Sequence, residues 1–187
     1  MSSQRAVAFV VGGLAVLSGL AGCGNAHQQV PTAHESFTSA TPKASNTLDP
    51  SASAALSGYK ASWAAVDEAG HAGDYQLPAL AEHMTGQVLE LVTQNLFLYQ
   101  ENGIVSRGAF VLHPQVKTED LAASPPTVTI SDCVDGRNDL LYYKSTGKPI
   151  DSDPGGFRAD TTVMSDIGGV WKATSSDVGA DGTCTPE

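Results

Sequence analysis

The hydrophobic periodicity of this chain changes once, from the spacing of a helix to the alternation of a strand, close to residue 103. Before that position, Leu56, Tyr59, Trp63 and Val66 recur at intervals of three or four residues, which is typical of an amphipathic helix. Beyond it, short runs with a period of two are separated by turns rich in Gly, Pro, Asp and Asn. Helices followed by strands with short connections predict an α+β fold with an antiparallel sheet.

Capping and breaking residues place the ends of the predicted elements. Asp49 as N-cap and Pro50 at the first helical position begin the first helix, and Gly70 and Gly73 end it. A short second helix is expected over residues 77–84, and a longer third helix begins at residue 85 and stops at Asn102-Gly103. Strands are expected over residues 104–112, 127–134, 140–144, 157–164 and 170–174.

The first 22 residues have the three parts of a secretory signal peptide. Arg5 supplies a positive charge, an apolar stretch follows over residues 6–20, and small residues lead to a cysteine. The apolar stretch is shorter than the roughly 20 residues of a membrane-spanning helix. Residues 1–22 are therefore predicted to be removed from the mature chain.

Cys23 closes the sequence Leu-Ala-Gly-Cys at residues 20–23, which resembles the lipobox of bacterial lipoproteins. The resemblance implies that the Cys23 thiol carries a diacylglyceryl group and that cleavage makes Cys23 the new N-terminus. Each buried methylene of such an anchor contributes about 0.8 kcal/mol, so two or three acyl chains hold a protein on a membrane. The other interpretation is an ordinary signal peptide that is cut near Ala21, with Cys23 incidental. We expect lipid anchoring to the cell membrane, on its extracytoplasmic face.

The segment after the lipobox contains too few large apolar residues to form a core. It is predicted to be a disordered tether that reaches on the order of 25–30 Å. The chain is thus expected to divide into a signal peptide over residues 1–22, a lipidated cysteine with its tether over 23–48, and one α+β domain over 49–187.

The charge of the chain restricts its partners. Twenty acidic residues against ten Lys and Arg give a formal charge of -10, which becomes -11 once Arg5 is removed. An acidic chain is a poor ligand for nucleic acid and for anionic headgroups. The expected partners are the membrane, through the lipid on Cys23, and either an envelope protein or an apolar small molecule, with no nucleic acid.

The two remaining cysteines, Cys133 and Cys184, form an even pair in a chain predicted to be exported, which favours a disulfide. A loop of about 50 residues would stabilise the fold by about 4 kcal/mol in the chain-entropy model. Two zinc ligands are the competing interpretation, but neither cysteine lies in a C-x-x-C or Cys/His pattern. The spacing of His71, Asp74 and His83 matches no metal motif either, and we expect no metal and no cofactor.

Short motifs are spread over most of residues 50–187. They are Tyr59 and Trp63 in the first helix, G-I-V-S-R-G at 103–108, D-C-V-D at 132–135, S-T-G-K-P at 145–149, G-V-W-K at 169–172, and Cys184. Together they resemble small actinobacterial lipoproteins with an NTF2-like (SnoaL-like) domain. The resemblance implies a cone in which helices pack on a curved antiparallel sheet around a cavity, and a place in the cell envelope. It implies little about activity.

One acidic residue is a catalytic candidate. In the strand predicted over 127–134, Asp132 shares a face with Val128, Ile130 and Val134. In an NTF2-like cone this face would line the cavity, where burial would raise the pKa of Asp132 and suit it to act as a general base in an isomerase- or cyclase-like reaction. The competing interpretation is a structural acid bonded to Arg137, Arg158 or a backbone N–H. No second catalytic residue can be identified from the sequence.

Four aromatic residues are candidates for the wall of a ligand pocket or, at the same spacing, for the core: Tyr59, Trp63, Tyr99 and Trp171. The chain has no G-x-S-x-G elbow and no phosphate-binding glycine loop. We therefore expect a membrane-anchored lipoprotein that binds a partner protein or an apolar small molecule rather than an enzyme. The alternative is a SnoaL-like isomerase or cyclase that uses Asp132 as its general base.

Overall fold

The computed structural model describes residues 48–150 and 155–186. The chain divides into two compact units, Met1–Ala44 and Ser45–Glu187, and the described residues belong to the second unit. The predicted signal peptide, the lipobox with Cys23 and nearly all of the predicted tether lie outside the described residues. None of the helices in the described ranges is long and apolar enough to cross a membrane.

Three helices come first in the described chain, as the sequence predicts: α1 (Pro50–Ala72), α2 (Pro78–His83) and α3 (Gly86–Glu101). The Asp49 side chain accepts a hydrogen bond from the backbone N–H of Ser51 at 2.7 Å, and Pro50 takes the first helical position. Gly73 ends α1 with φ of 63°, a left-handed conformation that glycine adopts without strain.

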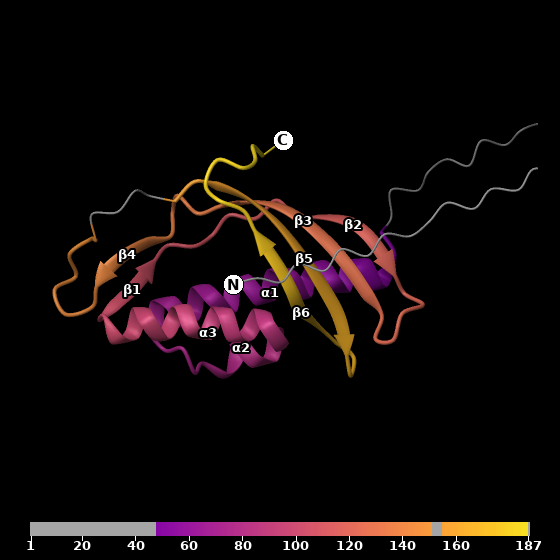
Figure 1. Cartoon of the computed structure of the whole chain (residues 1–187), viewed down its shortest axis with the longest axis horizontal. Helices are drawn as coiled ribbons and strands as arrows, with labels where there is room; N and C mark the ends of the chain where they lie inside the picture. Colours follow the sequence, from indigo (N-terminus) through magenta and orange to yellow (C-terminus); the bar gives the residue numbers. More distant parts are fainter. Residues whose placement is uncertain (1–47, 151–154, 187) are drawn as a thin grey trace, which may run out of the picture. The chain divides into compact units, whose positions relative to one another are not determined.

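The strands form two antiparallel sheets, neither of which closes on itself. The smaller sheet pairs β1 (Ile104–Arg107) with β4 (Leu140–Tyr143). The larger sheet contains β2 (Gln115–Asp120), β3 (Thr127–Asp135), β5 (Phe157–Ile167) and β6 (Val170–Val178), in that spatial order. Figure 1 shows α1 running along this four-stranded sheet, and α1 contacts β3, β5 and β6. The predicted class is confirmed: the fold is α+β, with helices followed by a curved antiparallel sheet, and it is consistent with an NTF2-like fold.

The strand predicted over residues 104–112 is too long. It ends at Arg107, because Gly108 has φ of 101° and an added Cβ there would collide with the backbone of Asn138. Strand β2 was not predicted, because it is an edge strand whose side chains are exposed apart from the half-buried Val116. An edge strand of this kind carries no apolar alternation. Strands β5 and β6 continue beyond their predicted ends at residues 164 and 174.

Helix α1 approaches the sheet closely because most residues of its inner face are small. Ala52, Ala55, Ala65 and Ala69 are all buried there. At Gly58 an added Cβ would lie 2.6 Å from the backbone oxygen of Trp171 in β6, so no larger residue fits without displacement. This close approach brings the next residue of α1, Tyr59, directly against the strands.

Candidate functional site

Tyr59 lies between two aspartates in the interior of the domain. Its hydroxyl oxygen is 2.9 Å from Oδ2 of Asp132 in β3 and 2.8 Å from Oδ2 of Asp160 in β5. The two aspartates face each other as Cα partners in the β3–β5 ladder. All three side chains are buried, and Tyr59 is fully inaccessible. We call this cluster the Asp–Tyr–Asp cluster.

Hydrogen atoms in the Asp–Tyr–Asp cluster can be counted. A phenol has one O–H, so Tyr59 donates to only one of its two carboxyl neighbours at a time. An ionised carboxylate only accepts, so the second short contact requires a carboxyl that carries its own proton and donates it to the Tyr59 oxygen. The cluster therefore holds one carboxylic acid and one carboxylate.

The surroundings of the two carboxyl groups indicate which of them carries the proton. Asp160 accepts from the hydroxyls of Thr162, at 2.8 and 3.1 Å, and Ser176, at 2.9 Å, in addition to Tyr59. Asp132 accepts from the backbone N–H of His113, at 2.6 Å, and from that of Cys133, besides Tyr59. Each carboxyl group therefore has three donors, and the charge of Asp160 raises the pKa of Asp132. We assign the carboxylate to Asp160 and the proton to Asp132, with the O–H groups running from Asp132 through Tyr59 to Asp160.

Burial is the largest influence on all three pKa values. It raises the pKa of Asp132, while the His113 backbone N–H and the Tyr59 hydroxyl act in the opposite direction. It also raises the pKa of Asp160, against the hydroxyls of Thr162 and Tyr59. Burial beside two acids raises the pKa of the Tyr59 phenol, which therefore keeps its proton. The expectation that burial raises the pKa of Asp132 is confirmed.

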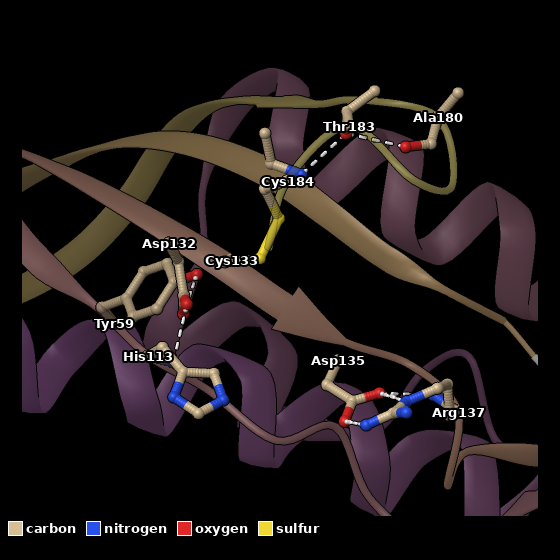
Figure 2. The surroundings of a disulfide bond; sticks show 10 residues. Tyr59, His113, Asp132, Cys133, Asp135, Arg137, Ala180, Thr183 and Cys184 are labelled. Carbon is tan, nitrogen blue, oxygen red and sulfur yellow. Dashed lines mark hydrogen bonds and ion pairs between the residues drawn. A yellow bond between two sulfur atoms is a disulfide. The ribbon is translucent and has the colours of Figure 1, made fainter. Parts of the chain in front are cut away.

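The predicted facing of β3 is also confirmed. Val128, Ile130, Asp132 and Val134 are buried, at 0, 0, 7 and 2% exposure. Figure 2 shows Asp132 directed toward Tyr59 and His113, while the neighbouring Cys133 is directed the other way, toward Cys184. Of the partners that the structural interpretation offered for Asp132, the structure contains the backbone N–H. Arg137 pairs instead with Asp135, and Arg158 with Asp181.

Two small cavities lie between the helices and the strands. The first, which we call the sheet chamber, has a volume of about 120 Å³ and lies between α1, α3, β5 and β6. Its apolar wall consists of Trp63, Val66, Met84, Val88, Val92, Ala173 and Val178, and its hydroxyl groups are those of Ser62, Thr162 and Ser176.

The second cavity, the β1 chamber, has a volume of about 170 Å³ and shares Val66 and Val92 with the first. The rest of its wall consists of Gly70, Asn95, Leu96, Tyr99, Ser106, Phe110 and Asp139. Buried Oδ1 atoms of Asp139 and of the nearby Asp67 have no hydrogen-bond partner among the described residues. Burial is the main cause that raises the pKa of Asp67 to about 6, and the charge of Asp139 adds to it.

The four aromatic candidates separate into two groups. Trp63 lines the sheet chamber and Tyr99 lines the β1 chamber. Tyr59 and Trp171 are core residues that line neither chamber; Tyr59 takes part in the Asp–Tyr–Asp cluster instead. Asp132 is likewise absent from both chamber walls and lines a separate open pocket with His113, Pro114 and Gln115.

Asp160 was missed by the sequence analysis. It lies within a predicted strand and shares a face with Thr162 and Met164, which are also buried. The alternation in the sequence gave no signal for it, because the opposite face, with Phe157, Ala159 and Val163, is the more apolar one. Its pairing with Asp132 depends on the register of β3 against β5, which no local pattern reveals.

The predicted disulfide is confirmed. Cys133 and Cys184 are bonded, with their Cα atoms 5.8 Å apart. The bond attaches the segment after β6 to the outer face of β3 (Figure 2). Within residues 48–150 and 155–186, no group of three or more His, Cys, Asp or Glu side chains is arranged to hold a metal ion.

Comparison with known proteins adds little to this geometry. No protein-family model matches the chain, and no curated protein matches it significantly. Among solved structures, the intermembrane space region of the chloroplast protein ARC6 is similar, at 14% identity and a TM-score of 0.43. That likeness covers 72% of this chain and 99% of the other, and at this level it carries no argument about function.

Proposed function

We propose that this protein is a lipoprotein, anchored through Cys23 to the extracytoplasmic face of the cell membrane, whose domain binds an apolar small molecule. The observation that carries the binding proposal is the pair of adjoining chambers between the helices and the strands. A cavity of about 150 Å³ lined by apolar side chains accepts one benzene ring, so each chamber is about the size of one ring or a short aliphatic chain.

The chambers support a small molecule better than a partner protein. Their walls are concave and mostly apolar with a few polar groups, which is typical of small-molecule sites. Two residues that could have belonged to the core, Trp63 and Tyr99, contribute to these walls. The alternative is that the domain binds a partner protein through its surface, in which case no ligand would be retained in the chambers.

Native mass spectrometry tests the binding proposal. The full chain with Cys23→Ser, which removes the thiol that would carry the lipid, is incubated under non-reducing conditions with an envelope lipid extract. We expect a retained small molecule in this protein. Val92→Phe should abolish retention because Val92 belongs to both chamber walls, whereas Leu91→Phe, at an exposed position of the same helix, should not. Equal retention by both variants would contradict the proposal.

The anchor is tested separately. Cys23→Ser should abolish incorporation of a labelled fatty acid, because it removes the thiol that would carry the lipid. Cys133→Ser, which leaves the lipobox intact, is the control and should remain labelled. A Cys23→Ser protein that still carries the label would contradict lipidation at this residue.

The second candidate is an enzyme of the SnoaL-like kind that uses Asp132. The observation in its favour is that Asp132 has an acidic partner, Asp160, to which it is linked by hydrogen bonds through the Tyr59 hydroxyl. Against it, both oxygens of Asp132 are already hydrogen-bonded, and Asp132 lines neither chamber. Asp132→Asn separates the two candidates. If the protein is an enzyme that uses Asp132, the variant should lose turnover of the bound ligand. If the protein only binds, ligand retention should be unchanged.

A further inference from the structure

The three hydroxyl groups of the sheet chamber have already used their hydrogen atoms. The Ser62 hydroxyl donates to the backbone oxygen of Tyr59 at 2.7 Å. The Thr162 and Ser176 hydroxyls both donate to Asp160. A hydroxyl has one hydrogen and two lone pairs, so each of the three oxygens can still accept a hydrogen bond but cannot donate one.

The negative charge next to the sheet chamber also favours a ligand group that donates a hydrogen bond. Asp160, on which Thr162 and Ser176 converge, is the carboxylate of the Asp–Tyr–Asp cluster. A negative charge in a buried, poorly solvated environment acts strongly on groups that are brought close to it. It repels an anion and attracts a cation or the positive end of a polar bond.

The β1 chamber offers acceptors as well. The buried Oδ1 atom of Asp139 has no partner within the described chain, and the Ser106 hydroxyl donates to the same carboxyl group. A ligand that extends from the sheet chamber past Val66 and Val92 therefore meets acceptors at both ends. The wall of the β1 chamber also contains the Asn95 amide and the Tyr99 hydroxyl, which can donate, so the selection for a donor applies to a headgroup in the sheet chamber.

We propose that the chambers select apolar ligands whose polar end is a hydrogen-bond donor, a primary alcohol or amine, and reject the carboxylate of equal length. This selectivity rests on the proposed function, because it concerns the same chambers. Among the residues of the sheet-chamber wall, Trp63 alone carries a side-chain N–H, and Trp63→Phe shows whether that group affects the selection.

Calorimetric titration with three matched ligands tests the proposal. The full chain with Cys23→Ser is titrated at pH 7 with 1-octanol, octylamine and octanoate, since about eight carbons correspond to two chambers that each hold about one ring. We expect the alcohol and the amine to bind at least about tenfold more tightly than octanoate. A tenfold difference corresponds to about 1.4 kcal/mol. Trp63→Phe should preserve this order.

Variants of α3 and β5 identify the site and the cause. Val92→Phe should abolish binding of all three ligands and Leu91→Phe should not. Asp160→Asn removes the charge and leaves the hydroxyls of Thr162, Ser176 and Tyr59 one acceptor oxygen in place of two, so octanoate should then bind within about threefold of octanol. Circular dichroism verifies that this variant is folded; if it is not, the titration of the unsubstituted chamber decides alone.

The possible outcomes distinguish failure of the donor selectivity from failure of ligand binding itself. If the three ligands bind equally and Val92→Phe abolishes their binding, the donor selectivity is overturned and the proposed function stands. If none binds, or if Val92→Phe binds as well as Leu91→Phe, the proposed function and the selectivity are overturned together. A folded Asp160→Asn variant that still discriminates tenfold overturns the role given to Asp160.

Discussion

Replacing the two buried aspartates one at a time tests the proton assignment in the Asp–Tyr–Asp cluster. In Asp132→Asn, the amide oxygen still accepts from the His113 backbone N–H, and the amide N–H₂ donates to the Tyr59 oxygen. This is the polarity of a protonated Asp132, so no hydrogen bond of the cluster is lost, and at pH 7 the variant should be no less stable than the unsubstituted protein. Asp160→Asn has no such match, because its N–H₂ replaces an oxygen that accepts from hydroxyl groups.

The cost of Asp160→Asn follows from the contacts. If the N–H₂ takes the place of Oδ1, the Ser176 hydroxyl loses its acceptor, and if it replaces Oδ2, the Tyr59 hydroxyl does. Hydrogen bonds to charged groups contribute about 1.5–3 kcal/mol, and a buried donor without a partner adds to the loss. We expect a destabilisation of about 3 kcal/mol.

Urea unfolding at pH 7 measures both changes. With an m-value of about 1–3 kcal/mol per molar urea, Asp160→Asn should lower the midpoint by about 1–3 M, and Asp132→Asn should not lower it. A larger loss in Asp132→Asn than in Asp160→Asn would refute the assignment and place the proton on Asp160.

The pH dependence gives a second measurement. A carboxyl whose pKa is raised by folding binds its proton more tightly in the folded state, so the protein loses stability as pH rises from the ordinary value of about 4 through the raised one. Asp132→Asn removes this loss. The stability of the variant relative to the unsubstituted protein should therefore increase between pH 5 and pH 8, and a constant difference would contradict the reasoning.

Three further predictions concern other parts of the domain. Asp67→Asn should stabilise the fold by about 1 to 2 kcal/mol at pH 7, after allowance for partial solvent screening, and have no effect at pH 4. The reason is that folding raises the pKa of Asp67 to about 6, so its ionisation removes stability as pH rises toward that value. Urea unfolding at pH 7 and at pH 4 measures the difference, and an equal effect of Asp67→Asn at both pH values would contradict the prediction. Gly58→Ala should destabilise the fold by about 1–3 kcal/mol through overpacking against Trp171, despite the higher helix propensity of alanine. Ser57→Ala, on the exposed side of α1, is the control and should not destabilise it; thermal unfolding compares the two variants. Cys133→Ser should cost about 4 kcal/mol, and the unsubstituted protein under reducing conditions should lose the same amount; a much smaller loss would mean that the loop is constrained without the bond.

Local patterns predicted most of the fold because the residues that define helices and strands act over short distances. Helix α1 begins at Asp49-Pro50 and ends at Gly73 because of contacts with neighbouring backbone groups, so both ends can be predicted from the sequence alone. The alternation in β3 placed Asp132 on the buried face for the same reason. Strand β2 escaped prediction because only its pairing with β3 makes it a strand.

The chain by itself determined the order of helices and strands, the inward direction of Asp132, and an even pair of cysteines free to form a disulfide. Only the tertiary structure decided that Asp160 faces Asp132 and that Tyr59, about seventy residues earlier in the chain than Asp132, separates them. It also decided that Trp63 and Tyr99 line chambers while Trp171 fills the core. The physical reason is that strand register and the close contact of α1 with the sheet depend on the packing of many residues at once, and no local sequence pattern encodes such packing.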